Sequence, residues 1–126
     1  MTDLELFSTE ETTKILVELG VPANLQGFKY LQHCIVNVIQ DPNKIKKVTK
    51  KLYPIIGEKY KVNGSVVERS IRHATDIAYF KTGFKSLPKL FGLEENYVDS
   101  KPTNCELIAM IAEALRFKCF KAGLLA

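Results

Sequence analysis

Apolar residues recur along the chain at the three- and four-residue intervals of amphipathic helices, and no stretch alternates between apolar and polar positions as a strand does. This spacing predicts an all-α protein of about six helices, without the strands of a winged motif. The predicted helices lie at about 9–19, 27–40, 42–52, 53–60, 65–81 and 103–119, with one or two further helical turns at 86–92. Because the chain has 126 residues, we expect one domain over 1–126, large enough to bury a single core.

Local sequence marks the beginnings of several of these helices. A Ser or Thr followed three residues later by Glu forms a capping box, in which the two side chains bond the free amides of a helix start. We take three instances of this pattern as helix starts, at Ser8–Glu11, Ser65–Glu68 and Thr103–Glu106. We expect Asp41 to cap the third helix, with Pro42 at its first position.

The helix at 65–81 is predicted to have two chemically different faces. Its apolar residues follow the spacing of one helical face, which we therefore expect to be buried: Val67, Ile71, Ala74 and Ala78. In its first turns, hydrogen-bonding side chains should point away from that face: Ser65, Glu68, Arg69, Arg72 and His73. A buried stripe combined with an outward polar cluster near the N-terminus is typical of a helix that reads a DNA groove.

The helices at 53–60 and 65–81, joined by a tight turn that contains Asn63 and Gly64, have the order of a helix-turn-helix. We therefore place this motif at about 53–81. Gly57 should permit the close approach of the two helices. Because any helical hairpin shares parts of this pattern, the chemistry of the exposed side chains has to support the assignment.

The net charge of +4 is distributed unevenly along the chain. Residues 44–61 carry seven lysines against one acid, whereas residues 1–20 carry five acids against one lysine. A lysine run by itself is more often a solvated helix face than a binding site. Here it directly precedes the proposed recognition helix, with Lys59 and Lys61 at its end, and this position favours a polyanion-binding face.

The outward residues of the recognition helix have the chemistry of major-groove contacts. Arg69 and Arg72 can donate two hydrogen bonds to a guanine, and Glu68 can accept one from a cytosine amino group. Ser65, the amides of the helix start and the nearby lysines suit phosphates. Each residue also has a purely structural interpretation, since Glu68 can close the capping box and Arg72 can pair with Asp76 on the helix surface. Together they favour DNA binding.

Other classes of function find little support. Cys34, Cys105 and Cys119 fit neither a disulfide framework nor a metal site, and we expect each to be a small core or half-buried residue. We expect no cofactor and no enzyme, because His73 and Asp76 share an exposed helix without a nucleophile, a metal set or a Gly-rich phosphate loop. No apolar run has the length of a membrane span, and the N-terminus has no signal segment, so we expect a cytoplasmic protein.

Five segments of the chain resemble the C-terminal effector domain of the stage 0 sporulation protein A family, the master response regulators of endospore-forming bacteria. These segments are GVP at 20–22, LYP at 52–54, SVVERSIRHA at 65–74, LFG at 90–92 and KPTNCELIAM at 101–110. The resemblance runs in order from about residue 12 to about residue 118. Its two long segments are specific, because their length and order leave little room for chance.

The resemblance implies a six-helix domain whose helix-turn-helix binds a TGTCGAA-type box in double-stranded DNA, often as tandem copies on adjacent sites, which would form a homodimer there. It also implies contact with an RNA polymerase sigma subunit through about Phe84–Leu93. The DNA contacts carried over by position fall on residues that the helical spacing already turns outward: Ser65, Glu68, Arg69, Arg72 and His73.

Two features depart from the family pattern. The family's recognition helix usually begins Ser-Arg-Val-Glu-Arg, with the first Arg contacting a base, whereas this chain has Val66. Loss of one bidentate contact is worth about 1–3 kcal/mol of discrimination, so the box read here should be relaxed or altered, unless Val66 contacts a thymine methyl group instead. The second departure is the receiver domain, for which 126 residues leave no room, so we expect either a fragment or a stand-alone effector.

Two hypotheses for the function follow. In the first, the chain is a sequence-specific double-stranded DNA-binding transcription regulator that reads the major groove with 65–81, Val66 included. In the second, it is a helical protein-interaction module that modulates a full-length relative or RNA polymerase without productive DNA reading. Val66 and the missing receiver motivate the second hypothesis, and a mobility-shift series with box-containing and random DNA separates the two.

Overall fold

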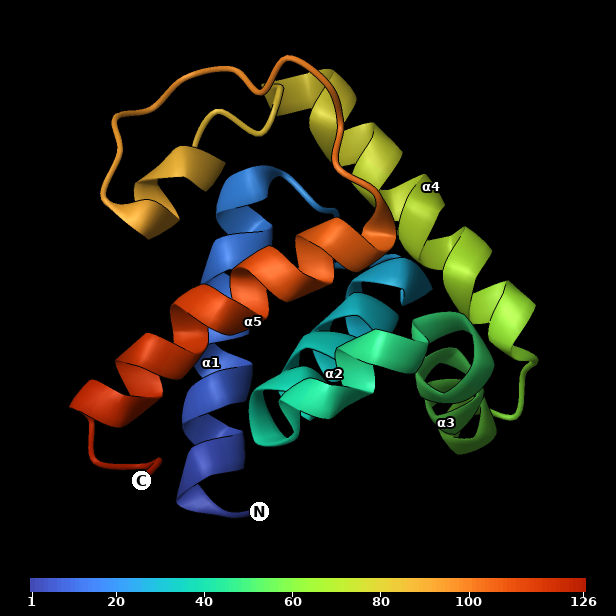
Figure 1. Ribbon diagram of the computed structural model, residues 1–126. Coiled ribbons are helices and arrows are strands. Elements are labelled where there is room, and N and C mark those ends of the chain that lie inside the picture. The colour runs from blue at the N-terminus through green and yellow to red at the C-terminus, as the bar shows by residue number, and fades with distance from the viewer.

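The computed structural model describes residues 1–126, and every regular element in it is helical. Five α-helices and three short helical segments follow one another without a strand, so the all-α prediction is confirmed and the expected number of about six helices is close. In chain order the elements are α1 (Asp3–Leu19), α2 (Gln26–Gln40), η1 (Pro42–Lys47), η2 (Val48–Leu52), α3 (Tyr53–Tyr60), α4 (Gly64–Thr82), η3 (Leu87–Phe91) and α5 (Asn104–Lys121) (Figure 1).

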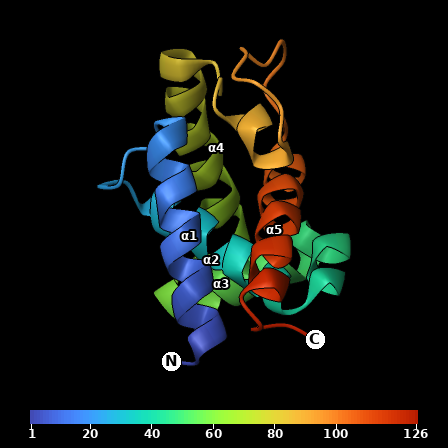
Figure 2. The same cartoon turned by 90° about the vertical axis from the view of Figure 1, so that its left-hand side faces the viewer.

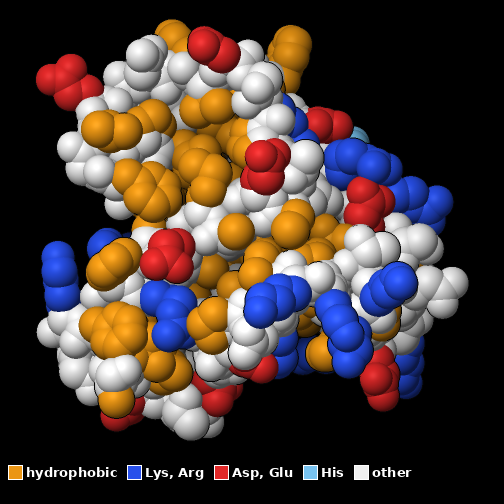
Figure 3. Space-filling model, viewed as in Figure 1, with side chains coloured by type: hydrophobic (Ala, Val, Ile, Leu, Met, Phe, Trp, Pro, Cys, Tyr) orange, Lys and Arg blue, Asp and Glu red, His pale blue; other side chains and the backbone are white.

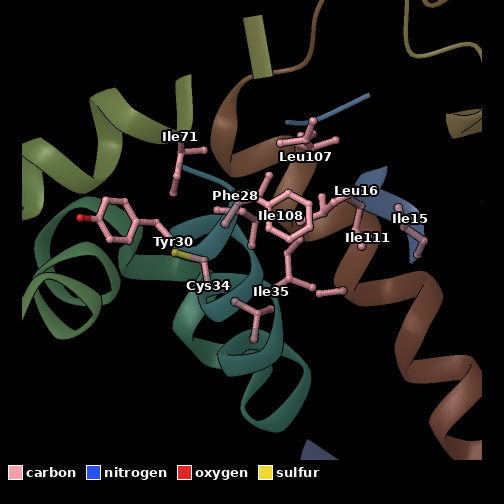
Figure 4. Close-up of a cluster of buried hydrophobic side chains, with 14 of the residues drawn as sticks. Ile15, Leu16, Phe28, Tyr30, Cys34, Ile35, Ile71, Leu107, Ile108 and Ile111 are labelled. Atoms are coloured by element: carbon pink, nitrogen blue, oxygen red, sulfur yellow. The ribbon is translucent and has the colours of Figure 1, made fainter. Parts of the chain in front are cut away.

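The helix α2 lies at the centre of the fold and packs against α1, α3, α4 and α5. Its buried residues Leu31, Cys34 and Ile35 belong to one core of 27 buried apolar residues, to which every α-helix contributes (Figure 4). The segments η1, η2 and α3 lie at the same end of the molecule as the two chain termini, and η3 with the loop before α5 lies toward the other end (Figures 1 and 2). No helix is long and apolar enough to cross a membrane.

The first predicted capping box, Ser8–Glu11, is wrong. The helix α1 begins at Asp3, and Thr2 caps it by accepting a hydrogen bond from the backbone amide of Glu5 at 3.1 Å. Ser8 is instead buried inside the helix, with its hydroxyl 3.8 Å from the sulfur of Cys119. Leu4 and Phe7 of the extra turns pack against the core. Thr2 and Glu5 have the same capping-box spacing as Ser8 and Glu11, and the prediction took the later of the two patterns as the helix start.

The second predicted capping box, Ser65–Glu68, is also wrong. The helix α4 begins two residues earlier than the box implies, at Gly64, and its N-cap residue Asn63 makes no side-chain capping bond. The carboxylate of Glu68 pairs with Arg72 instead of reaching back to the helix start. The third box is confirmed, because Thr103 and Glu106 exchange the two hydrogen bonds that define it.

The buried stripe of α4 is confirmed, and a glycine of α2 allows it to sit close to the core. Val67, Ile71 and Ala78 are fully buried. A Cβ atom added at Gly27 would lie 2.1 Å from the carbonyl oxygen of Ser70, so only a residue without a side chain permits this crossing. The outward face of α4 is therefore held by a contact on its opposite side.

The turn between α3 and α4 shows the close approach expected at Gly57. A Cβ atom there would lie 2.4 Å from the carbonyl oxygen of Val62, and the Val62 amide donates to the Gly57 carbonyl oxygen at 2.9 Å. Lys61 ends α3 in the left-handed conformation, with φ of 59°. This turn fixes α3 against the start of α4.

The lysine-rich segment before α3 is not an α-helix. Asp41 caps it as expected, accepting a hydrogen bond from the backbone amide of Asn43 at 3.1 Å. The segment then forms the 3₁₀-helix η1 and the π-helix η2, which closes with a bond from the Tyr53 amide to the Val48 carbonyl oxygen. Its apolar positions are too sparse to define one helical face, so Val48 and Leu52 alone anchor η2 while its lysines stay exposed.

Candidate nucleic-acid interface

The first turns of α4 carry the predicted polar cluster on the outside of the molecule. Ser65, Arg69, Arg72 and His73 are exposed, and Val66 and Glu68 are half-buried. The structure thus brings the predicted α4 residues together in the first turns of one helix. Figure 3 shows Lys and Arg side chains gathered along this side of the molecule, over α4 and the segment that precedes α3.

Glu68 and Arg72 form an ion pair on the surface of α4, with Nη1 of Arg72 2.7 Å from Oε1 of Glu68. The alternative pairing of Arg72 with Asp76 does not form, because Asp76 pairs with Lys101 at 3.0 Å across the loop that leads to α5. A pair one helical turn apart on an exposed face is worth only about 0.3–0.5 kcal/mol. Glu68 and Arg72 are therefore held near each other but are easily separated by a competing partner.

Arg69 and His73 differ from that pair, because neither takes part in an ion pair or a side-chain hydrogen bond within the chain. Their exposed donors are satisfied by water in the free protein. Both side chains can therefore exchange solvent for an acceptor on a ligand without breaking an internal contact.

Lys59 and Lys61 lie beside the turn that leads into α4, and both are exposed. The ammonium group of Lys59 lies 6.0 Å from the centre of the Tyr60 ring, which itself packs edge-on against His33. Burial lowers the pKa of His33, and the positive charges of Lys59 and Lys29 lower it further. His33 thus lies at the edge of this basic region, where the neutral form of its side chain is favoured.

A cleft of about 880 Å³ opens beside the N-terminal half of α4, between the lysine-rich segment and the start of α5. One wall is η1 and η2, with four exposed lysines, and the other is formed by residues 101–105. Glu68 and Arg72 lie at its border with α4. Burial raises the pKa of Tyr53, which lines the cleft, to about 12, so its phenol stays protonated there at neutral pH.

The wall at 101–105 contains residues that sequence reasoning did not assign to the site. The side-chain amide of Asn104 donates to the backbone carbonyl oxygen of Glu68 at 3.2 Å and so joins the start of α5 to α4. This contact spans 36 positions. The conspicuous KPTNCELIAM segment was the one available signal, but it indicated family membership and not a place beside α4.

The three cysteines differ in their exposure. Cys34 and Cys119 are buried, as expected, but Cys105 is exposed on the wall of the cleft, so the prediction of a core or half-buried position is wrong for this residue. It occupies the second residue of α5, where the helix start faces solvent. No group of three or more His, Cys, Asp or Glu side chains is placed to hold a metal ion.

A short helix, a tight turn and a longer helix with an outward polar face, set in an all-helical fold, define the helix-turn-helix class of DNA-binding proteins. The family model described as "Sporulation initiation factor Spo0A C terminal" matches residues 12–115. The chain belongs to this family. This family comprises the DNA-binding effector domain of a sporulation regulator. The chain is therefore a DNA-binding domain that belongs to the regulation of transcription in sporulation.

Proposed function

We propose that the chain is a sequence-specific double-stranded DNA-binding transcription regulator that places α4 in the major groove. The observation that carries this proposal is the exposed start of α4, where Arg69 and Arg72 project from a helix seated on α2 through Gly27. A recognition helix must hold its donors in fixed positions, because a bidentate contact depends on geometry as well as charge. The helix-turn-helix proper spans about 53–81 within a domain of 1–126.

The contacts divide into those that read bases and those that position the helix. We assign Arg69 and Arg72 to guanine edges and Glu68 to a cytosine amino group. The remaining predicted residues suit phosphates, which fix the register on the duplex without reading sequence. These are Ser65, His73, Lys59 and Lys61, all exposed around the start of α4.

Val66 sets the expected difference from a TGTCGAA-type box. Its side chain is half-buried and carries no hydrogen-bonding group, so it can contact a thymine methyl group but cannot reproduce an Arg contact. We therefore propose a related box with altered or relaxed preference at one position. Tandem boxes would bring two copies of the chain side by side as a homodimer on DNA.

A second proposed partner is an RNA polymerase sigma subunit, through about Phe84–Leu93. Phe84 and Leu87 are buried within this range, whereas Lys89, Phe91 and Leu93 are exposed. The exposed side chains of this range therefore lie before η3, at Lys85, and from Lys89 onward. The exposed Phe91 and Leu93 also support the alternative function, a protein-interaction module without productive DNA reading.

Mobility-shift titrations of box-containing and scrambled duplexes of equal length, at several salt concentrations, test the proposed function. We expect tighter binding to the box, with both affinities falling steeply as salt rises because bound phosphates release counterions. No shift with either duplex at low salt would rule out DNA binding and leave the interaction module. Equal affinity for both duplexes would rule out sequence-specific reading.

A further inference from the structure

The cleft beside α4 has an unbalanced charge. Its lining includes four lysines from η1 and η2 that form no ion pair within the chain: Lys46, Lys47, Lys50 and Lys51. The single acidic residue of the lining, Glu68, is already paired with Arg72. Like charges held close together repel one another, so this wall favours a ligand that supplies several negative charges.

The opposite wall of the cleft is fixed in place. The hydrogen bond from Asn104 to the Glu68 carbonyl oxygen joins it to α4 at 3.2 Å. Lys101, which also lines the cleft, is tethered to Asp76 of α4 at 3.0 Å. These two contacts fix this wall against α4, and the cleft is present in the free protein.

The lysine wall also has an unusual backbone. The π-helix η2 carries Lys50 and Lys51 at its C-terminal end, immediately before α3. Single π-turns are rare and occur frequently at functional sites. Lys50 and Lys51 remain exposed in η2, although Val48 and Leu52 of the same turn are buried.

The cleft is continuous with the proposed DNA-reading face, because Arg72 and Glu68 belong to both. We propose that this cleft binds the phosphodiester backbone of the same duplex, beyond the bases that α4 contacts. The inference rests on the proposed function and adds a second contact region to it. The walls supply ammonium groups and the hydroxyl and amide groups of Thr103 and Asn104, which suit phosphate oxygens and carry no base preference.

Charge removal on the lysine wall tests the proposal. The double variant Lys50→Gln/Lys51→Gln keeps most of each side chain but loses both charges, and Lys85→Gln/Lys121→Gln is the matched control from exposed lysines outside the cleft. We expect the cleft variant to weaken binding to box and scrambled duplexes by the same factor. The slope of log affinity against log salt should fall by about 1 for each lysine that neutralises a phosphate.

An unchanged salt slope in the cleft variant, with intact binding by the unaltered protein, would overturn the proposal and leave the reading of bases by α4 untouched. A slope reduced equally by the control variant would overturn it too. Failure of the unaltered protein to bind any duplex would instead refute the proposed function. Circular dichroism of each variant checks that the helical fold is retained.

Cys105 provides an independent measurement, because it is the exposed cysteine on the cleft wall while Cys34 and Cys119 are buried. We expect a saturating box duplex to slow the modification of Cys105 by a maleimide at least several-fold. Inorganic pyrophosphate at the same total phosphate concentration should leave the rate unchanged. Equal protection by pyrophosphate would overturn the proposal in favour of a small-anion site, and unchanged reactivity in the DNA complex would overturn it outright.

Discussion

Arg72 donates a hydrogen bond from Nη1 to Oε1 of Glu68 at 2.7 Å, so two side chains proposed to read different bases are bonded to each other in the free protein. Both are at least partly exposed, and their pairing in water is worth about 0.3–0.5 kcal/mol. A guanine edge and a cytosine amino group offer the same two side chains stronger, desolvated partners. The pair therefore limits where the two groups point without opposing their transfer to DNA.

Replacing Arg72 with Ala should lower the preference for box over scrambled DNA. Loss of one bidentate guanine contact corresponds to about 1–3 kcal/mol, or roughly 5- to 150-fold in the affinity ratio. Lys81→Ala, from the exposed last turn of the same helix, is the control and should leave the ratio unchanged. Fluorescence anisotropy titrations give both affinities, and a ratio unaffected by Arg72→Ala would remove this residue from base reading.

Glu68→Gln should change which base is preferred and not simply weaken binding. A carboxylate accepts from cytosine, whereas a Gln side chain makes a bidentate contact with adenine. We expect the variant to favour adenine over cytosine at one position of the box, measured with duplexes that differ there alone. If cytosine remained equally preferred, Glu68 would have a structural role as the partner of Arg72.

Val66→Arg should sharpen discrimination within a TGTCGAA-type box. The new side chain supplies the donor that the position lacks, worth about 1–3 kcal/mol, or roughly 5- to 150-fold. Val66→Lys is the matched control, because it adds the same charge without the planar fork of Arg. Similar gains for both variants on box and scrambled duplexes would show a general charge effect and no base contact at this position.

Gly27→Ala should destabilise the fold even though helix propensity predicts the opposite. Ala is favoured over Gly inside a helix by about 1 kcal/mol. At Gly27, however, the added Cβ would lie 2.1 Å from the Ser70 carbonyl oxygen and force α2 away from α4. Overpacking of this kind costs about 1–3 kcal/mol or more. Urea unfolding should show a net loss of stability, while Gln26→Ala, on the exposed side of α2, should not.

The ion pairs of Glu11 should make stability depend on pH in the acid range. Hydrogen bonds from Lys118 and then from Lys14 hold the pKa of Glu11 below its usual value of 4.5. A lowered folded-state pKa contributes stability that is fully present above the unfolded value and is lost as pH falls through the folded value. Thermal unfolding of Glu11→Gln should therefore lose less stability than the unaltered protein below pH 4.5.

The control for that measurement is Glu113→Gln, an exposed carboxylate of α5 that forms no ion pair. It should follow the pH profile of the unaltered protein. An identical profile for Glu11→Gln would mean that the contact between α1 and α5 through Lys118 contributes nothing measurable.

Local periodicity was sufficient to predict much of the fold and the buried face of α4. The stripe that contains Val67 and Ile71 is buried as expected, because a 3.6-residue period directly reports a helical face. The capping boxes predicted at Ser8 and Ser65 are wrong because the same short pattern can also occur inside a helix. In α1, residues such as Leu4 pack against the core and the helix extends N-terminally past Ser8. Capping patterns indicate possible starts, and tertiary contacts decide among them.

The cleft was not predictable in the same way. Its lysine wall was visible as a charged run, but the opposite wall comes from the start of α5, and the contact between Asn104 and Glu68 depends on how α5 crosses α4. No local pattern in a single sequence encodes such a contact. For the same reason, the sequence did not indicate that Asp76 pairs with Lys101 and that Arg72 pairs with Glu68.

Selection of bound sequences from a random double-stranded DNA pool is the most direct test that α4 reads bases. We expect enrichment of one motif related to TGTCGAA, with weakened or altered preference at the position that Val66 faces. The same selection with Arg69→Ala/Arg72→Ala should lose the preference for guanine at the positions assigned to these residues. Recovery of no motif by the unaltered protein, or of the same motif by the double variant, would contradict this account.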